Sequence, residues 1–420
     1  MNLRSQHNVV VVGGGTAGLA AAVAAGRSGA QTLLIERYGF LGGSMTAGLV
    51  NPFMPFNAGE EQIVHGIFQE IIDRLARMDG YDKKTRAFDP EIMKVVADEM
   101  VQEAGVELLL HTCVIDVIMH GNEIFGVEVH NKSGRQLVSG KVFVDATGDG
   151  DVAVMAGAPY EKGRKQDGLM QPMTLVFRMA GVDVSRVPPR KEINRLFLEA
   201  KAAGIVNIPR ENVLYFSTTH KGELHFNSTR VLKADGTNVE DLTRAEIEAR
   251  RQMVELAKFF KERVPGFENA YLSRSGAEIG VRETRRIIGE YVMTGQDIIE
   301  ARKFKDVIAR GSYWIDMHNP VGQGQEDNPY AKKCPPPGES YDIPYRCLVP
   351  KKVENLLVAG RCISTTREAQ AAIRIMPTVV AIGEAAGTAA ALAAKHGVYP
   401  RKLDVSLLQH VLRERGANLG

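Results

Sequence analysis

A glycine-rich turn between two apolar segments constrains the fold of this chain more than any other feature. Residues 8–12 (NVVVV) form a β-branched run typical of a strand that is buried on both faces of a parallel sheet. The sequence GGGTAG follows at 13–18, and the Ala-rich stretch 19–28 predicts a helix. A second apolar strand at 31–35 ends at Glu36, so this part of the chain predicts a βαβ unit.

The glycines of this unit have the spacing GxGxxG, which is typical of dinucleotide binding when it joins a strand to a helix. Gly13 permits the tight turn, Gly15 lets the backbone approach a pyrophosphate, and Gly18 lets the helix lie close to the sheet. Free N–H groups at the helix start attract the anion, and an acid about 20 residues further on binds the ribose. The sequence therefore predicts a bound dinucleotide rather than an empty turn. The predicted contacts are Gly13, Gly15, Thr16, Ala17, Gly18 and Glu36.

Two further patterns favour FAD over a nicotinamide cofactor. Residues 39–44 (GFLGGS) place a second glycine turn just beyond Glu36, where a longer dinucleotide can continue. Residues 107–145 change to short apolar runs that break at 121–122 and 133–134, which predicts an antiparallel meander. A contiguous nicotinamide dehydrogenase sheet would lack this meander. The cofactor contacts predicted in the second glycine turn and after the meander are Gly42, Gly43, Ser44, Thr147, Gly148 and Asp149.

Composition excludes several classes of protein. The 420 residues predict two or three domains, and 44% hydrophobic with 24% charged residues is typical of a globular protein rather than a disordered one. A formal charge of +2 is far below the excess expected for nucleic-acid binding, so no nucleic-acid partner is predicted. The four cysteines form no CxxC pair, and we expect no metal site and no iron–sulfur cluster.

No membrane segment is expected either. Residues 9–25 are long and apolar enough to suggest a membrane span, but their glycines divide them into strand, turn and helix. Residues 1–7 are polar and lack the apolar region of a signal peptide. We therefore expect a cytoplasmic protein.

Changes in the residue pattern along the chain predict two domains. Residues 1–160 and 345–420 are expected to form a discontinuous cofactor domain, which includes helices at 60–80 and 90–104 and a strand at 355–360. Residues 161–344 mix strand-like runs with charged helices such as 244–263, and predict an inserted α+β domain that covers the substrate.

The C-terminal helix predicted at 377–395 is rich in small residues. Gly383 and Gly387 are explained by close packing of this helix on the sheet. A second interpretation adds that the helix start, with Gly383, approaches the flavin and stabilises the negative charge of its reduced form.

Taken together, these features resemble the FAD-dependent oxidoreductase family of the glutathione-reductase-like flavoprotein superfamily. The resemblance covers nearly the whole chain. The motifs that carry it are GxGxxG at 13–18, Glu36-Arg37, Leu41-Gly42-Gly43, ATGDGD at 146–151, IGVRETRR at 279–286, AGRCIS at 359–364, RIMP at 374–377 and GEAAGT at 383–388.

The resemblance implies an α/β fold in which FAD lies across a parallel sheet beside the antiparallel meander. It implies adenine contacts from the backbone near Val114, and flavin contacts from Gly360, Arg361 and the region of Met376. Arg37 follows the ribose-binding acid and is included among the predicted cofactor contacts. The chain departs from its relatives in two respects: it lacks iron–sulfur cysteines, and Thr366-Arg367-Glu368 stands where a relative has a His.

Since a flavin performs the redox step itself, the protein is expected to supply groups that position an anionic substrate or move a proton. The catalytic candidates are Arg282, Tyr345, Arg374 and His65. An arginine fork suits a carboxylate, but ordinary ion pairs are the alternative for Arg282, Arg285, Arg286, Arg361, Arg367 and Arg374.

Three other side chains are also candidates. His220 and His225 flank an alternating stretch of the middle domain and could donate a proton. Cys362 stands next to Arg361, which could lower the pKa of its thiol.

The function expected from these patterns is that of an FAD-dependent dehydrogenase, oxidase or reductase. A hydride would pass between a small polar or anionic organic substrate and flavin N5, and an electron acceptor that the sequence does not identify would complete the cycle. Two alternatives stay open: a flavoprotein electron carrier that serves a partner protein, and a biosynthetic use of the dinucleotide as in thiazole synthases. A homo-oligomeric state is also left open.

Overall fold

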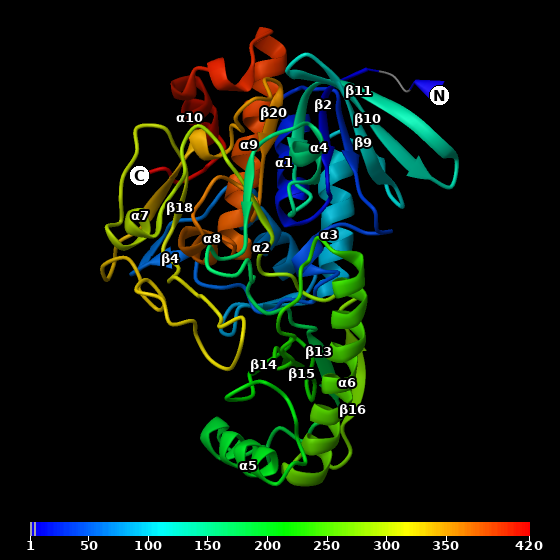
Figure 1. Ribbon diagram of the computed structural model, residues 1–420, viewed down its shortest axis with the longest axis vertical. Helices are drawn as coiled ribbons and strands as arrows, with labels where there is room; N and C mark the ends of the chain where they lie inside the picture. Colours follow the sequence, from blue (N-terminus) through cyan, green and yellow to red (C-terminus); the bar gives the residue numbers. More distant parts are fainter. Residues whose placement is uncertain (1, 4–5) are drawn as a thin grey trace.

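A parallel sheet forms the centre of the larger lobe in the computed structural model, which describes residues 2–3 and 6–420 (Figure 1). Its strand order is β8-β3-β2-β11-β20, and every neighbouring pair is parallel. The middle strands are buried on both faces, as their β-branched sequences predict. The strands are β2 (His7–Val12), β3 (Thr32–Ile35), β8 (Glu107–Leu109), β11 (Gly134–Asp145) and β20 (Leu356–Val358). The polar start expected at 1–7 lies partly outside the described residues.

The predicted meander is confirmed. β9 (Cys113–His120), β10 (Glu123–Asn131) and β11 form an antiparallel ladder whose turns lie at the two predicted breaks. β11 continues from this ladder into the parallel sheet, where it pairs with β2 and β20. The short β1 (Asn2–Leu3) pairs with the meander part of β11. The structure is therefore an α/β fold with a sheet rich in parallel pairs.

Two helices from opposite ends of the sequence lie side by side against this sheet (Figure 1). They are α1 (Thr16–Arg27) and α9 (Met376–His396). A Cβ atom on Gly383 would overlap the Ala17 carbonyl oxygen, and one on Gly387 would overlap that of Ala21. The two contacts are four residues apart in α1 and four residues apart in α9, and they follow the same order in both helices. α1 and α9 therefore run in the same direction with their backbones in contact.

This contact corrects the roles predicted for Gly383 and Gly387. Both glycines pack α9 on the helix α1 rather than on the sheet, and Gly383 lies against backbone rather than open to a cofactor. α9 is also long and apolar enough to cross a membrane, but almost all of it is buried inside the protein, as in a core helix.

Other helices cover the larger lobe. Asp89 caps α3 (Pro90–Glu103), where its carboxylate accepts from Glu91 N at 2.7 Å, as the Asp-Pro pair predicts. The helix predicted at 60–80 is shorter, because Gly66 has φ 59° at its start and residues 57–62 form a small hairpin instead. The remaining helices of this lobe are α2 (Ile67–Arg77), α3 (Pro90–Glu103), α4 (Asp151–Met155), α7 (Gly295–Ile299), α8 (Arg367–Ile373) and α10 (Val405–Glu414).

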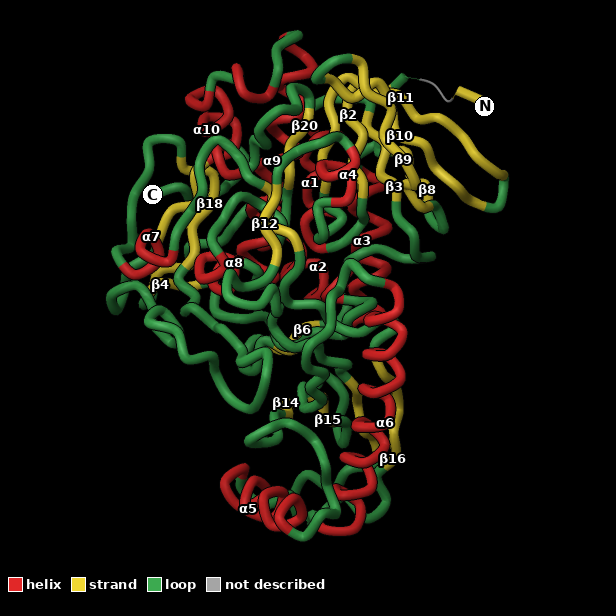
Figure 2. Tube along the Cα trace, in the orientation of Figure 1, coloured by secondary structure: helices red, strands yellow, loops and turns green. Residues whose placement is uncertain are grey.

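A smaller lobe extends below this body (Figures 1 and 2). Its sheet has the antiparallel order β14-β15-β13-β16. It has its own aromatic core, in which the Phe177 and Phe226 rings stack at 4.9 Å. Its elements are β13 (Phe177–Ala180), α5 (Arg190–Ala202), β14 (Tyr215–Ser217), β15 (Leu224–Phe226), α6 (Val239–Arg263) and β16 (Tyr271–Ser275).

Residues that follow the smaller lobe return to the core of the larger one. Ile287, Val307 and Tyr341 pack in the same hydrophobic cluster as the parallel sheet and α9. The core of the larger lobe therefore takes up much of 287–344, which the sequence had grouped with the inserted domain. Short ladders in the larger lobe are β4 (Asn57–Ala58) with β5 (Glu61–Gln62), β6 (Tyr81–Asp82) with β7 (Ala87–Phe88), β12 (Tyr160–Lys162) with β17 (Arg285–Ile287), and β18 (Val307–Gly311) with β19 (Tyr341–Pro344).

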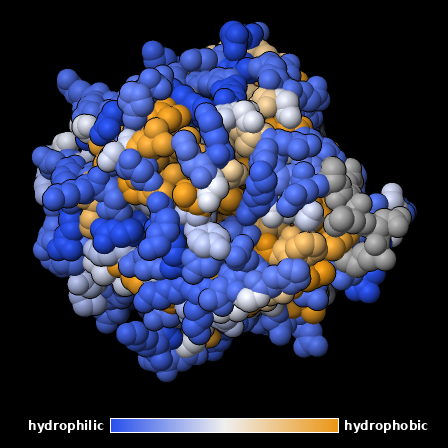
Figure 3. All heavy atoms as spheres, turned by 90° about the horizontal axis from the view of Figure 1, so that it is seen from above, coloured by the Kyte–Doolittle hydropathy of each residue, from blue (hydrophilic) through white to orange (hydrophobic). Residues whose placement is uncertain are grey.

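The surface of the larger lobe is mainly hydrophilic on the face seen from above, with apolar side chains gathered in patches between polar ones (Figure 3). Single exposed apolar residues such as Ile115, Phe125 and Tyr399 are normal for a globular protein.

Candidate functional site

A glycine cradle surrounds the start of α1. We define it by Gly13, Gly15, Gly42, Gly43, Gly148 and Gly360. Gly13 has φ +94°, and a Cβ there would lie 2.7 Å from the Ala146 carbonyl oxygen. Gly43 has φ +54°, and its Cβ would lie 2.7 Å from Gly15 Cα. These positions require glycine, both for backbone conformation and for close approach.

Gly15 is different from its neighbours. A Cβ at Gly15 would meet Gly43 Cα at 3.8 Å and no other atom closer, so space lies in front of this residue. Gly15 is also the N-cap of α1, and no side chain of the described residues caps this helix. Unpaired N–H groups at an open helix start form a ready site for an anionic phosphate.

Hydrogen bonds join the two glycine turns. Gly42 N donates to the Gly14 carbonyl at 2.9 Å, and Thr16 Oγ1 donates to the Gly42 carbonyl at 3.1 Å. The hydroxyls of Thr16 and Ser44 are 3.0 Å apart. The second turn is thus fixed across the start of α1, where the sequence predicted that a longer dinucleotide continues.

Glu36 lies at the end of β3 and is almost fully buried. Its carboxylate accepts from Gly14 N at 2.6 Å and from Tyr38 N at 2.8 Å, which fixes its orientation. Each carboxylate oxygen retains a further lone pair for a ribose hydroxyl. Val114 is the second residue of β9 and follows Thr112 by two residues. The Thr112 N–H donates to the Glu36 carbonyl at 3.0 Å, so Val114 lies near this end of the cradle. Arg37 forms an ion pair with Glu278 and is more than half exposed.

The other side of the cradle comes from the turns after β11 and β20. Gly360 has φ +100° and lies against Ala17, while a Cβ on Gly148 would lie 2.5 Å from the Arg361 guanidinium. Arg361 donates to Asp149 Oδ1 at 2.6 Å. Thr147 donates to buried Asp145, whose pKa burial raises to about 6. Thr147 and Asp149 are therefore engaged with protein groups, whereas the Nε of Arg361 is buried without a hydrogen-bond partner.

A second open helix start lies further along the same direction. α9 begins at Met376 without a side-chain cap in the described structure. Gly383 of α9 lies beside Ala17 of α1. α9 starts seven residues before Gly383, whereas α1 starts one residue before Ala17. The start of α9 therefore extends six residues, or about 9 Å, beyond the start of α1.

These features fit FAD. Space in front of Gly15, two open helix starts with the same orientation, an oriented Glu36 carboxylate and the unpartnered Arg361 Nε are suited to an extended anionic dinucleotide. Gly15, Thr16, Ala17 and Glu36 would hold the pyrophosphate and ribose, and Gly360 with Met376 would hold the flavin end.

A group of charged side chains lies at the junction of the two lobes. We call it the arginine cluster and define it by Arg210, Arg230, Arg282, Arg374, Asp316 and His318. Two predicted catalytic candidates, Arg282 and Arg374, meet here. Burial, with the charges of Arg374 and Arg210, holds the pKa of Arg282 well below its usual value. Burial, with the charge of Arg230, lowers the pKa of Arg210 to about 10.

Asp316 and His318 lie between these arginines. Arg374 donates to the Asp316 backbone carbonyl at 3.1 Å, and His318 Nε2 is 3.3 Å from the Asp316 carboxylate. Burial opposes the charge of Asp316, but the His318 N–H with Arg374 and Arg282 holds its pKa well below the usual value. Burial and the charge of Arg282 lower the pKa of His318 to about 4, so His318 is neutral at pH 7.

The arginine cluster lies beside the start of α9. Arg374 directly precedes the N-cap of α9, and the backbone carbonyls of Tyr313 and Ala372 both accept from the Tyr341 hydroxyl. The side chains of Asp316, His318 and Arg374 retain 14–16% exposure, so solvent reaches the cluster. A small molecule held here would lie near the flavin end of the cradle.

Other predicted candidates lie elsewhere. The Tyr345 hydroxyl is buried and donates to the Pro400 carbonyl at 2.9 Å, so Tyr345 has a packing role and does not join the cluster. The His65 ring is 2.9 Å from the Gln62 carbonyl at the start of α2. His225 is fully buried, and burial with the charge of Arg178 lowers its pKa to about 3, which rules it out as a proton donor at neutral pH. His220 pairs with Asp89 at 2.7 Å.

The prediction for Cys362 is wrong. Burial raises the pKa of its thiol well above the usual value, and this effect exceeds that of the neighbouring Arg361. Cys362 is therefore an unreactive core residue. The described residues include no group of three His, Cys, Asp or Glu side chains in a metal-binding arrangement.

Ion pairs explain most of the candidate arginines. Arg367 and Arg286 pair with Glu283, Arg361 with Asp149, Arg285 with Asp151, and Arg374 with Asp316. The structure describes all six candidate arginines, and Arg282 is the one among them that forms no ion pair with a carboxylate.

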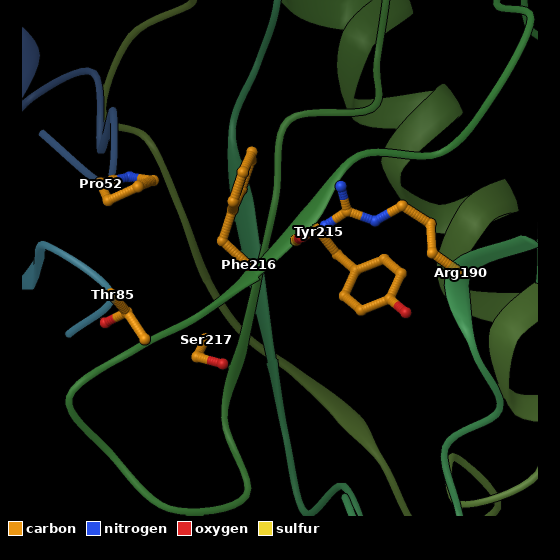
Figure 4. Close-up of a pocket in the computed structure, with 6 residues that line it drawn as sticks. All are labelled: Pro52, Thr85, Arg190, Tyr215, Phe216 and Ser217. Atoms are coloured by element: carbon orange, nitrogen blue, oxygen red, sulfur yellow. Dashed lines mark hydrogen bonds between the residues drawn. The ribbon is translucent and has the colours of Figure 1, made fainter. Parts of the chain in front are cut away.

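A separate pocket of about 220 Å³ lies between the lobes (Figure 4). Pro52 and Thr85 of the larger lobe face Arg190, Tyr215 and Phe216 of the smaller one, and the Arg190 guanidinium lies 5.0 Å from the centre of the Tyr215 ring. None of its lining residues belongs to the cradle or the arginine cluster.

Fold and cradle together define an α/β protein built to bind a dinucleotide. A family model described as FAD dependent oxidoreductase matches residues 8–412. The chain therefore belongs to the FAD-dependent oxidoreductase family, and the family and FAD cofactor expected from the sequence are confirmed.

Two further proteins are similar to parts of this chain or to its fold. Thiamine thiazole synthase of Methanococcus maripaludis is 30% identical over 156 residues, which cover 35% of this chain and 58% of the relative, less than two thirds of its length. A geranylgeranyl bacteriochlorophyll reductase-like protein from Thermoplasma acidophilum aligns with 99% of this chain and 85% of its own, at 14% identity and a TM-score of 0.50. Similarity at this identity shows the fold alone.

Sequence reasoning missed Arg210, Arg230 and Asp316. The first two come from loops of the smaller lobe, and Asp316 comes from a loop of the larger lobe. One local signal existed: Asp316 and His318 alternate with apolar residues in the run WIDMH, which suggests that they share one face.

Proposed function

We propose that this chain is an FAD-dependent oxidoreductase that transfers a hydride between a carbon of a small polar or anionic substrate and flavin N5. FAD, when bound, supplies the redox chemistry. The observation that carries the proposal is the position of the arginine cluster beside the start of α9, about 9 Å beyond the start of α1. Arg282 and Arg374 are proposed to bind and orient the substrate there.

The proposal includes a domain assignment. The parallel sheet with its meander is proposed to be a glutathione-reductase-like FAD domain. The separate aromatic core of the smaller lobe supports an inserted substrate domain of about 161–286, shorter than the 161–344 expected from the sequence. The other cofactor contacts predicted from the sequence are kept as proposals, except Gly383.

A small-molecule substrate is favoured over an electron-carrier role. Arginines from both lobes meet at their junction, as expected for a substrate site beneath a covering domain, whereas an electron carrier has no need of such a cluster. A cytoplasmic location and a homo-oligomeric state remain predictions.

The thiazole synthase alternative rests on the partial match to thiamine thiazole synthases. That match covers 35% of this chain, and a shared dinucleotide-binding unit would account for a match of this kind. It therefore supports a bound dinucleotide more strongly than it supports thiazole synthesis.

The test is an absorption spectrum of the purified protein, followed by anaerobic reduction with a panel of small acids, amines and alcohols. We expect a yellow protein whose flavin band bleaches with at least one compound of the panel. Absence of bleaching with every compound, together with reduction by a redox partner protein, would support the electron carrier instead. Consumption of NAD without flavin bleaching would support a biosynthetic role.

A further inference from the structure

The arginine cluster carries more positive charge than its acids compensate. Among the described residues, Glu211 pairs with Arg230 at 3.3 Å and Asp316 pairs with Arg374 at 3.4 Å. No carboxylate lies within ion-pair distance of Arg210 or Arg282 in the described structure. Since His318 is neutral at pH 7, two cations remain without an anion.

The uncompensated positive charge of the arginine cluster destabilises the folded protein unless a negative group lies nearby. Burial of a charge without a partner strongly destabilises a protein even after the surroundings relax, and removal of one partner of a buried pair has the same effect. Arg210 is 2% exposed. Besides burial, the charges of Arg374, Arg210 and Arg230 lower the pKa of Arg282, and the charge of Arg230 lowers the pKa of Arg210. A site of this kind is expected to gain its missing negative charge from a ligand.

The hydrogen bonds of Arg282 leave part of its guanidinium available. Its NH1 group donates to the Pro172 carbonyl at 2.5 Å and to Thr174 Oγ1 at 2.8 Å, which fixes the side chain. A guanidinium has five N–H donors, so the donors on NH2 and Nε remain for another group. Arg374 Nε is buried without a partner, and the one hydrogen bond that the Arg210 side chain donates in the described structure runs from its Nε to the Asn212 carbonyl.

We infer that Arg282 and Arg210 bind a carboxylate of the substrate, so that the compound that exchanges a hydride with the flavin is a small organic acid. A guanidinium fork and a carboxylate are both planar and form two parallel hydrogen bonds, which sets the orientation of the acid as well as its affinity. This inference rests on the proposed function, because it names the substrate class of that site.

The cluster binds the acid and does not take its proton. Arg230 NH2 donates to His318 Nδ1 at 3.2 Å, and His318 Nε2 faces the Asp316 carboxylate at 3.3 Å. Both ring nitrogens are therefore engaged, and Asp316 is held in its ionised form by the cations around it. Arg282 and Arg210 act as substrate-binding residues.

The test is a calorimetric titration of the FAD-loaded protein with succinate, with succinamide as its uncharged analogue and inorganic phosphate as a second anion. We expect succinate to bind at least tenfold more tightly than either of the others. Arg282→Met and Arg210→Met should each weaken succinate binding at least tenfold, and Arg282→Lys by less. Arg195→Met removes the same charge from an exposed site on α5, where Arg195 pairs with Glu192 and Glu199 and with no residue of the cluster, and should leave binding unchanged.

A thermal measurement separates binding from a merely structural role. Without ligand, Arg210→Met should unfold at a higher temperature than the wild type, because a buried cation with like-charged neighbours is removed. Succinate should raise the unfolding temperature of the wild type and not of this variant. A lower unfolding temperature of the ligand-free variant, with unchanged succinate affinity, would overturn the inference.

Other outcomes are equally decisive. Equal binding of succinate and succinamide would exclude a carboxylate site, and arginine-dependent binding of phosphate alone would assign the cluster to a phosphate. Because these titrations need no turnover, succinate binding that depends on Arg282 supports the carboxylate site even if no compound bleaches the flavin. Bleaching by uncharged alcohols alone would retain the proposed function and remove the organic acid.

Discussion

The glycine cradle and the arginine cluster lie close together but are built in opposite ways. The cradle consists of glycine backbone, and four of its six glycines lie between residues 13 and 43. The cluster consists of side chains from well-separated segments, at 210, 230, 282, 316–318 and 374. A cofactor held by backbone leaves a spacing of glycines in the sequence, whereas a substrate held by distant side chains leaves no local pattern.

Two buried acids show the same contrast in their electrostatics. Glu384 lies inside α9 and accepts from Ile67 N at 3.0 Å, and burial raises its pKa to about 7. Asp316 lies among arginines, and its pKa is held well below the usual value. Burial penalises both carboxylates, but at Asp316 the His318 N–H with the charges of Arg374 and Arg282 reverses the direction of the pKa shift.

The largest effect should follow from Gly15→Val, which alters the cradle alone. Space lies in front of Gly15, so the valine side chain should fill the proposed pyrophosphate site without displacing protein atoms. We expect FAD affinity to fall at least a thousandfold, about 4 kcal/mol, while the chain remains folded. Flavin content after purification and circular dichroism measure the two properties.

The matched control for this variant is Gly322→Val. Gly322 also lacks a positive φ, and a Cβ there would meet Asn319 Nδ2 at 3.4 Å in a loop outside the cradle. It should retain its flavin. Full flavin content in the Gly15 variant would contradict the assigned site.

The second effect, Gly387→Ala, tests the contact that aligns the two helix starts. The added methyl group would overlap the Ala21 carbonyl oxygen, so α1 and α9 must separate. We expect a loss of about 3 kcal/mol in the free energy of unfolding, at the upper end of the cost of overpacking. Denaturant unfolding measures it, with Gly322→Ala as the control, and an unchanged midpoint would show that the helices are not in close contact.

The sequence predicted the parts of the fold that rest on local patterns. The βαβ unit, the meander and the apolar C-terminal helix follow from periodicity and glycine placement, and the structure confirms them. Gly383 was assigned to the cofactor because it lies near the start of a helix, but which surface that helix packs against depends on tertiary structure. The length of the helix at 60–80 was overestimated, because the apolar spacing continued through Gly66 and its left-handed conformation.

The candidate site was predictable only in part. Arg282 and Arg374 were two of six candidate arginines. The sequence could not show that the other four form ion pairs with carboxylates, which explain their presence without a substrate. Arg374 also has a carboxylate partner, and its place in the cluster depends on Asp316, which is 58 residues away. Tyr345 was expected near the substrate because of its place in the sequence, yet its hydroxyl is bonded to Pro400.

The smallest effect concerns the two buried acids and depends on pH. The folded-state pKa of Glu384, about 7, lies above the ordinary 4.5, so its contribution to stability is present below pH 4.5 and is lost as the pH rises through 7. Glu384→Gln retains an acceptor for Ile67 N and removes the ionisation. We expect this variant to be about 2 kcal/mol more stable than the wild type at pH 8, with no such gain at pH 4.5.

Urea unfolding at both pH values checks this prediction. Asp145 also has a raised pKa, but it is present in both proteins and cancels in the difference. A gain of equal size at pH 4.5 and pH 8 would show that Glu384 does not titrate in this range. The corresponding change of Asp316 should instead destabilise the protein, because its charge compensates Arg374.

The parallel contact of α1 and α9 also has a consequence for biosynthesis. The ribosome synthesises the glycine turn more than 350 residues before the second helix start. At roughly 5–20 residues per second, the nascent polypeptide exposes an unfinished pocket for about 20 seconds or more. Stable capture of FAD must therefore wait until both helix starts have been synthesised and have come together.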